Sequence, residues 1–579
     1  MVWIKFTLEY NYINKSTAFR LYTCILALLI IVSISAVPTP ACAQAENVPA
    51  SHPVYDFLHR MEVQRVLPRY HGTVVPLSRE KVGEYVAKVY EHSDRLSRTD
   101  RDLASLYFVE FAFDIDGRLR QTSTLFSGDS SEEGPRGIFT NRQKYLYAWH
   151  DTSGNSMFVD GIVSYEHRSR YRNGDIADGR SRPSLNLVNL GGRMRGTLGG
   201  RFGYYLKGAN MMVKGDRQFA REDNRIVHSH SFRRSGEDFA EYSSAYIRYD
   251  AGIAGIQLGR ERVQWRESLG ESLFLSSNAP LFNFLRIDLS YGAVNYNYIH
   301  GTVLFHNYRE IEENKYFVAN RFEFSLFDNR LQMALNQTTM YSRAVPEIGY
   351  LIPFNILEAT ERNLGDRDAS MIGFDIAVRP VRNFEIKTGM FFDDIHFDRS
   401  FTEGWNNMWS VHAGFLYTHL FGIPDIDLTA NYTRIEPHVY SHHRDPYVHH
   451  EHDGFVLGHP LGPNSDEWYA ALAYRPGWQW RVSLEFFRQR HGDNVIDEDG
   501  TVIRNVGGDI YFPWRRGIDP VEKQFLDGIL TEQHTMRLQV RYEIFRQFIV
   551  GIRAEWSDLS REEQSLQHVT LSGGIWLGM

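Results

Sequence analysis

The sequence predicts an all-β transmembrane barrel of about 18 antiparallel strands, preceded by a small α-helical periplasmic domain. From about residue 140 to the end, apolar and polar side chains alternate with a period of two. The connections between these segments alternate between short and long. The mean hydropathy is only −0.38 although 43% of the residues are hydrophobic, which a barrel with one lipid-facing and one polar face explains.

Composition excludes several other classes of protein. With 14% aromatic residues among 579, the chain is too rich in core-forming side chains to be disordered. Long apolar runs are scarce, which argues against a helical membrane protein. The net charge is −8, from 63 Lys and Arg against 71 Asp and Glu, so there is no reason to expect a nucleic-acid partner.

Residues 1–43 are expected to form a cleaved signal peptide. Basic residues precede an apolar run at 21–37, and small residues at 41–45 offer cleavage after Ala43 or Ala45. An N-terminal membrane anchor is the alternative, but the apolar run is short for a span. The stretch ahead of that run is unusually long, so translation could begin at a later codon.

Both cysteines, Cys24 and Cys42, belong to this N-terminal segment. A lipoprotein attached through Cys42 is a weaker interpretation, because the usual leucine is missing from the residues before it. After cleavage the chain has no cysteine, so it cannot use disulfides, thiolate metal ligands or a cysteine nucleophile. Its stability must then come from a core or from a membrane.

Residues 44–115 are expected to form a periplasmic domain of three helices. Apolar residues recur at helical spacing after three candidate caps, which are Ser51 with Pro53 close behind it, Ser78, and Ser97. Three helices in so short a segment make a small core. We therefore expect this domain to pack on the rest of the chain.

Residues 116–579 are expected to form the barrel. Segments such as 480–486 and 536–544 place apolar residues at every second position. Alternation alone also fits a soluble β-sandwich, so the connections must decide. Short turns are expected near 199–200, 328–329, 380–381, 422–424, 476–477 and 546–547. Long polar loops are expected at roughly 169–183, 215–237, 262–281, 343–368, 396–407, 441–465 and 491–533. This is the pattern of an outer-membrane barrel.

Lipid gives the physical reason for this arrangement. Strands that span a bilayer turn apolar side chains outward and satisfy every backbone group by pairing. Counting back from the C-terminus gives about 18 strands, the first near Met157. A further segment at 145–149 could belong to another pair of strands, so the alternative count is 20. Charged residues expected to line the lumen are Arg481, Glu485, Arg537, Arg541, Glu543, Arg553 and Glu555.

The loop at 436–466 has the most unusual composition, with seven of the chain's 23 histidines. Imidazole beside carboxylates suits zinc or copper, but no spacing fixes a ligand set, and no metal is predicted. Histidines and tyrosines that hydrogen-bond sugar hydroxyls and stack on pyranose rings are an equally good chemical interpretation. The third interpretation is an ordered external loop folded over the barrel.

Two further segments have structural interpretations. The insertion at 259–286 is expected to pack inside the barrel mouth, and the acidic stretch at 497–500 is expected to be a solvated hairpin tip because it lacks the later ligands of a calcium loop. There is no nucleophile-elbow, phosphate-loop or zinc-protease motif. The sequence therefore gives no support for an enzyme or for a cofactor.

Several of these segments resemble the Wzi family of capsule assembly proteins, which are lectin-like outer-membrane barrels. The likeness extends over nearly all of the mature chain and is carried by 53–60 with 76–78, by 275–280, and by 440–443 leading to 457–466. The family usually has Trp-Gly-Pro before the second of these elements, where this chain has Trp265, Arg266 and Glu267. The resemblance implies an 18-stranded barrel with a periplasmic helical bundle near one mouth. It also implies a role in holding capsular or extracellular polysaccharide at the cell surface.

We therefore expect a non-enzymatic outer-membrane barrel, surrounded by lipid, that binds or organises surface polysaccharide. The residues expected to bind the polysaccharide, chosen for their chemistry, are Tyr440, His442, His443, Arg444, Tyr447, His449 and His450. The alternative is a porin for sugars or other nutrients, whose lumen would be open, whereas the binding protein would have a plugged lumen. A third hypothesis, a hydrolase of lipid or glycan, needs a serine–histidine pair or two carboxylates in contact at the barrel wall.

Overall fold

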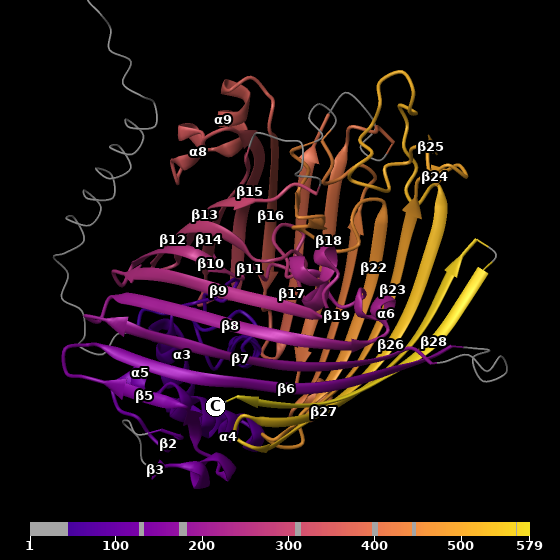
Figure 1. Cartoon of the computed structure of the whole chain (residues 1–579). Helices are drawn as coiled ribbons and strands as arrows, with labels where there is room; N and C mark the ends of the chain where they lie inside the picture. Colours follow the sequence, from indigo (N-terminus) through magenta and orange to yellow (C-terminus); the bar gives the residue numbers. More distant parts are fainter. Residues whose placement is uncertain are drawn as a thin grey trace, which may run out of the picture. The chain divides into compact units, whose positions relative to one another are not determined.

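The computed structural model describes residues 44–126, 132–172, 182–306, 314–396, 403–442, 447–562 and 564–578. The predicted signal peptide lies outside these residues. Within the described ranges, no helix combines the length and the hydropathy that a membrane span requires. The chain from Ala41 to Met579 is one compact unit, in which a large barrel follows a group of N-terminal helices (Figure 1).

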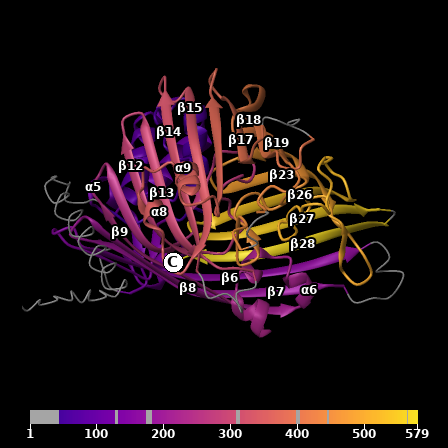
Figure 2. The same ribbon diagram turned by 90° about the horizontal axis from the view of Figure 1, so that it is seen from above.

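The strands close into an antiparallel barrel, which Figure 2 shows from above. Its members are β6 (Ser156–Arg172), β7 (Ser184–Leu198), β8 (Phe202–Gly215), β9 (Phe239–Asp250), β10 (Ala254–Glu261), β12 (Phe282–Tyr291), β13 (Val294–Val303), β14 (Asn314–Leu326), β15 (Leu331–Arg343), β16 (Ala369–Val378), β17 (Phe384–Asp394), β18 (Met408–Thr418), β19 (Ile426–Ile435), β22 (Ser465–Tyr474), β23 (Trp480–Asp493), β26 (Ile529–Phe545), β27 (Phe548–Arg561) and β28 (Gln564–Gly578). Pairing of β28 with β6 closes the ring.

This ring confirms the prediction of 18 strands. The segment that gave the alternative count of 20 strands contains β5 (Tyr147–His150), which pairs with the first residues of β6. β28 pairs with the same edge of β6 from Ile162 onward. β5 therefore continues that edge beyond the end of β28 and does not widen the barrel.

Short turns occupy one end of the barrel and long loops the other, as predicted, except that only two residues separate β27 from β28 at the long-loop end. The six expected turns join β7 to β8, β14 to β15, β16 to β17, β18 to β19, β22 to β23 and β26 to β27. In one of them Asp328 and Asn329 have φ values of 55° and 64°, a left-handed conformation that short polar residues tolerate and tight hairpins require. Two further turns, at 251–253 and 292–293, were not anticipated. We call the two ends the short-turn end and the long-loop end.

The two faces of the wall differ as the alternation predicts. Large apolar side chains are exposed on the outer face of nearly every strand, among them Leu190, Leu206, Ile247, Leu258, Phe324, Leu335, Phe374, Leu472, Leu484, Leu538, Ile552 and Leu571. Charged side chains face the lumen and pair across strands. The Arg537 guanidinium lies 2.8 Å from the Glu555 carboxylate and 3.0 Å from that of Glu485. An apolar outer band over a polar interior is the surface of a barrel that lies in a bilayer.

In the described part of the chain, four α-helices precede the barrel: α2 (Val54–Val63), α3 (Arg79–Glu91), α4 (Arg98–Glu110) and α5 (Ala112–Asp116). The Ser78 and Ser97 side chains accept hydrogen bonds from the amides of Lys81 and Asp100, which confirms both caps. Ser51 is not a cap, contrary to the prediction. Pro53 occupies the cap position of α2 and already has helical dihedrals, and the Val54 amide donates to His52 Nδ1 (3.2 Å). α5 was not predicted.

The remaining described strands and α-helices are short. They are β1 (Val74–Val75), β2 (Thr122–Thr124), β3 (Glu132–Glu133), β4 (Gln143–Tyr145), β11 (Gln264–Trp265), β20 (Glu451–His452), β21 (Phe455–Val456), β24 (Val495–Ile496), β25 (Val502–Arg504), α6 (Arg217–Ala220), α7 (Asn224–Val227), α8 (Ile348–Leu351) and α9 (Leu357–Asn363). The acidic stretch at 497–500 is the exposed turn between β24 and β25, as predicted.

Buried ion pairs attach the helical segment to the short-turn end of the barrel. Arg379, at the end of β16, lies 2.9 Å from the Glu62 carboxylate of α2 and 2.5 Å from that of Glu385. Arg60 of α2 lies 2.7 Å from the Asp427 carboxylate of β19. On other parts of the wall, Arg195 pairs with Glu46 and Arg546 with Glu110. Because these contacts are spread around the ring, the helical segment lies across this mouth of the lumen.

A second helical element lies outside the barrel. The β15–β16 loop, which carries α8 and α9, packs on outward-facing Tyr298, Tyr316 and Tyr341. The backbone of the loop also pairs with polar groups of the outer wall, since the Leu357 amide donates to the Gln337 side chain (2.9 Å) and the Asn320 amide group donates to the Asn355 carbonyl (3.3 Å). We call residues 344–368 the outer arm.

Replacing Arg379 with Gln should loosen the helical segment. The substitution leaves Glu62 and Glu385 buried without their shared cation, a loss that typically costs about 3–5 kcal/mol. We expect trypsin to cleave within residues 44–116 of the purified, detergent-solubilised protein about tenfold or more faster than in the unchanged protein.

Arg69→Gln is the matched control. Arg69 also joins the helical segment to a barrel turn, through Asp328, but both side chains are about two-thirds exposed (67% and 69%). Such an exposed pair contributes little, so the cleavage rate should stay the same. Equal cleavage of the Arg379→Gln and Arg69→Gln variants would contradict the assignment of Arg379 as the anchor.

Candidate functional site

The histidine-rich loop between β19 and β22 folds into the lumen. Its Tyr440 and His450 rings stack with centroids 5.4 Å apart and an interplanar angle of 17°. Phe391 packs on Tyr440 (5.4 Å), and Phe317 packs on His450 (5.8 Å). Both phenylalanines lie on strands of the wall, at positions that face inward. The loop therefore has an apolar core of its own inside the barrel.

The loop is bound to the insertion that the sequence placed inside the barrel mouth. The Tyr440 hydroxyl donates to the Leu273 carbonyl (2.7 Å), and the Ser276 hydroxyl donates to the Gly458 carbonyl (2.6 Å). His450 Nε2 lies 2.9 Å from the Phe274 carbonyl oxygen. We call residues 262–281 together with 436–464 the plug. Its insertion half also pairs with the helical segment, through β11 and β1.

A small hairpin anchors the plug to the wall. β20 and β21 are joined by Asp453 and Gly454, whose φ values of 54° and 90° are the left-handed values that a two-residue hairpin turn needs. The Lys315 ammonium of β14 is fully buried and donates to the Glu451 carboxylate (2.6 Å). Because this pair is buried at the wall, it holds the hairpin in one position.

The predicted contact residues divide between the plug and the surface. Tyr440, His449 and His450 are buried, with 0%, 2% and 0% exposure, and so hold the loop in place. Tyr447 is 48% exposed, and His442 is half-buried. His443 and Arg444 lie outside the described residues. Among the described members of the set, Tyr447 is the side chain that reaches the surface.

Burial sets the charge of the plug histidines. Burial, with the Lys315 ammonium nearby, lowers the pKa of His449 to about 3 and that of His450 to about 4. Burial likewise lowers the pKa of His438 to about 4. These imidazoles are therefore neutral at neutral pH and pack as aromatic rings.

Other aromatic side chains gather at the long-loop end. The Trp405 and Trp514 rings stack 3.9 Å apart at 7°, and Trp514 Nε1 donates to the Pro520 carbonyl (2.9 Å). Phe512 is 40% exposed, and Tyr447 packs edge-on against Phe305 (5.8 Å). We call Trp405, Tyr447, Phe512 and Trp514 the rim aromatics. Trp405, Phe512 and Trp514 were not predicted from the sequence. For the last two, the closely spaced aromatics of the polar loop at 491–533 were a usable signal.

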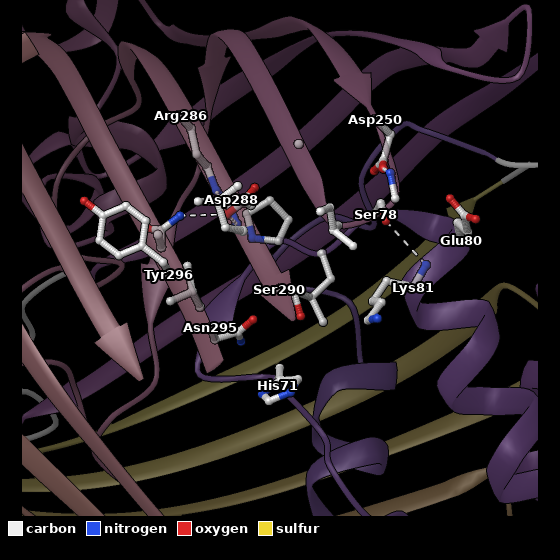
Figure 3. Close-up of a pocket in the computed structure, with 18 of the residues that line it drawn as sticks. His71, Ser78, Glu80, Lys81, Asp250, Arg286, Asp288, Ser290, Asn295 and Tyr296 are labelled. Carbon is white, nitrogen blue, oxygen red and sulfur yellow. Dashed lines mark hydrogen bonds and ion pairs between the residues drawn. The ribbon is translucent and has the colours of Figure 1, made fainter. Parts of the chain in front are cut away.

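A cavity of about 210 Å³ lies where the helical segment meets the wall (Figure 3). Its labelled lining residues are His71, Ser78, Glu80, Lys81, Asp250, Arg286, Asp288, Ser290, Asn295 and Tyr296. The charges at the wall compensate one another, since Arg248 pairs with Asp288 (2.9 Å) and Asp250 (3.2 Å), and Arg286 also pairs with Asp288 (2.8 Å). This balance, at the end away from the long loops, favours a structural joint over a binding site.

Two groups of side chains bring three candidate metal-ligand atoms within 4.8 Å of one another: His59 with Glu62 and Glu385, and Asp100 with His419 and Asp425. In both groups carboxylates already pair with arginine: Glu62 and Glu385 with Arg379, and Asp100 with Arg60. Within the described ranges the histidine-rich loop forms no such group.

The fold and the plug define a class of protein, a β-barrel of the outer membrane whose lumen holds a plug and whose short-turn mouth is crossed by helices. Residues 164–569 match the family of capsule assembly protein Wzi, and the chain belongs to that family. This confirms the resemblance seen in the sequence. No curated protein sequence matches the chain.

Solved structures with similar folds include the Wzi protein of Escherichia coli, described as an outer-membrane protein involved in group 1 capsule assembly and as a carbohydrate-binding β-barrel. It is 12% identical, with 92% of this chain and 99% of that chain covered and a TM-score of 0.55. OprD and the outer-membrane protein OpdK, both of Pseudomonas aeruginosa, are 10% and 9% identical, with TM-scores of 0.39 and 0.41. They cover 73% of this chain and 95% and 99% of their own, and scores this low carry no argument about function.

Acid should release the plug loop. The folded pKa values of His449 and His450 lie below the ordinary value of 6.5, so the undocked loop binds more protons than the docked loop below that pH. Docking is therefore fully favoured above pH 6.5 and weakens as the pH falls toward 4. Between pH 7 and pH 5 we expect protease cleavage within 436–464 to accelerate about tenfold or more.

His450→Gln should make this pH dependence shallower, because one of the titrating groups is gone. His92→Gln alters a histidine on the helical segment and should keep the full dependence. Cleavage rates that do not change between pH 7 and pH 5 in the unchanged protein would show that the histidines do not control docking.

Proposed function

We propose that the protein binds capsular or extracellular polysaccharide at the cell surface and organises it there without catalysing a reaction. Membership of the Wzi family supports this proposal, and so does the fold shared with a barrel described as carbohydrate-binding. The surrounding phase is outer-membrane lipid, which the apolar band of the barrel fits.

The observation that carries the proposal is the plug. Its two segments pack on inward-facing side chains from β12 to β19, and the helical segment lies across the opposite mouth. Such a barrel is poorly suited to free diffusion of solutes. Its long-loop end, where Tyr447 and Phe512 are exposed and Trp405 and Trp514 are half-buried, is the surface best suited to contact with a polymer outside the cell.

Aromatic rings suit this ligand chemically. The C–H faces of a pyranose pack on an aromatic face while its hydroxyls take hydrogen bonds from nearby polar groups. A repeating polymer can occupy several such positions at once, so that weak single contacts add up to useful avidity. In this proposal Tyr447 contacts the sugar, with His442, His443 and Arg444 beside it in the chain. Tyr440, His449 and His450 support the loop from below.

Removing rim aromatics should weaken polysaccharide binding. An aromatic contact is worth about 0.5–1.5 kcal/mol, so Tyr447→Ala and Phe512→Ala should each lower the apparent affinity about two- to tenfold. The measurement is retention of purified surface polysaccharide from the source cells on immobilised, folded protein, at several polysaccharide concentrations.

Phe421→Ala is the matched control, because Phe421 is 82% exposed but lies in a short turn at the other end. It should bind as the unchanged protein does. Undiminished retention by a combined Tyr447→Ala, Phe512→Ala and Trp514→Ala variant would remove the rim aromatics from the proposal.

The porin hypothesis makes the opposite prediction about conductance. In planar bilayers the unchanged protein should show little steady single-channel conductance, because the plug and the helical segment obstruct the lumen. Replacing 441–456 with a short Gly-Ser linker should raise the conductance severalfold. A large steady conductance of the unchanged protein would instead favour a porin.

A further inference from the structure

The plug fills one side of the lumen and leaves another side hollow. Along β26, β27, β28 and β6, which lie next to one another in Figure 2, a cavity of about 460 Å³ opens on the inner wall. Residues 222–225 of the β8–β9 loop complete its lining. This volume lies in the range of small-molecule binding sites.

Two glycines create the hollow. In the barrel register Arg541 lies opposite Gly551, Gly551 opposite Gly574, and Gly574 opposite Glu166. The middle of this inward-facing row therefore has no side chains. A Cβ atom at Gly574 would come within 2.6 Å of the Trp576 ring, and one at Gly551 within 2.9 Å. The absence of side chains thus lets the indole lie against the wall, where it forms part of the cavity lining.

The cavity carries an excess of positive charge. Arg168 and Arg225 are neutralised by Glu166 and Asp223, with distances of 2.6 to 2.9 Å. The Glu222 carboxylate pairs with Arg170.

Arg541 and Arg553 differ from these arginines. Neither has a carboxylate within ion-pair distance among the residues that the structure describes. Arg553 lies opposite Gln539, so the two arginines are diagonal neighbours on adjacent strands and flank the hollow from one side. Two like charges held this close favour a bound anion between them.

The geometry points to a binding site for an acidic sugar unit inside the lumen, with the sugar ring on Trp576 and its carboxylate on Arg541 and Arg553. The inference rests on the proposed function for the general class of ligand and adds that the ligand is anionic. A guanidinium pair binds a planar carboxylate through several charge-assisted hydrogen bonds, and an indole face is the usual partner of a pyranose. A neutral sugar would leave both arginines without a counter-ion.

Trigalacturonic acid and its methyl ester are suitable probes, because they share the same sugar rings and the ester lacks the negative charges of the acid. Titration calorimetry on the full chain in detergent should show the acid binding about tenfold or more tightly than the ester. The preference should shrink as the salt concentration rises. Failure of both probes to bind, or equal affinity for acid and ester, would overturn the inference on the unchanged protein alone.

Variants then locate the site. Arg541→Gln combined with Arg553→Gln should lower the affinity for the acid about tenfold or more and leave that for the ester unchanged. Trp576→Leu should weaken both. Arg561→Gln is the control, since Arg561 lies on β27 eight residues from Arg553, pairs with Asp493 at 3.4 Å and does not line the cavity. Unchanged affinity for the acid in the folded double variant would overturn the site.

The outcomes separate the inference from the proposed function. If surface polysaccharide binds through the rim aromatics but the double arginine variant binds trigalacturonic acid as tightly as the unchanged protein, only the lumen site is wrong. If the acid binds through the arginines but surface polysaccharide does not bind at all, the proposed function fails and the anion site stands.

Discussion

The requirement that no backbone polar group face hydrocarbon determines the rest of this structure. A strand in lipid can satisfy its amides and carbonyls only through neighbours, so the sheet must close, and β28 pairs with β6 to close it. Closure then divides every strand into an apolar outer face and an inner face that is free to be polar. The low mean hydropathy of a chain with so many hydrophobic residues is a direct consequence.

A polar lumen this wide must be filled by something other than the wall. The protein uses two kinds of filling. At the short-turn end, buried arginines such as Arg60 and Arg379 join helices to strands through paired carboxylates. Further along, the plug packs aromatic rings, and the histidines among them stay neutral because they are buried. The wall opposite the plug remains partly hollow and keeps two arginines that no carboxylate of the described chain neutralises.

Local patterns in the sequence predicted the barrel well, but they predicted poorly which loop residues are buried inside it. Alternation and turn spacing depend on neighbouring residues, so the strand count, the Ser78 and Ser97 caps and most turns could be predicted directly. Whether Tyr440 is exposed depends on Leu273, 167 residues away, which accepts its hydroxyl bond. No local pattern records such a contact. The cavity beside Arg541 and Arg553 could not be predicted from local patterns either, because Gly551 and Gly574 become neighbours only in the barrel register.

The outer arm has a consequence for how the barrel is made. Asn320 and Gln337 lie opposite each other on the outer wall, at a level where other strands present apolar residues to lipid. Until Asn355 and Leu357 of the arm reach them, these two amides would face hydrocarbon without partners, at a cost of several kcal/mol. The arm must therefore dock before or during entry of this wall into the bilayer. On this side of the protein, membrane insertion therefore does not precede the folding of a loop.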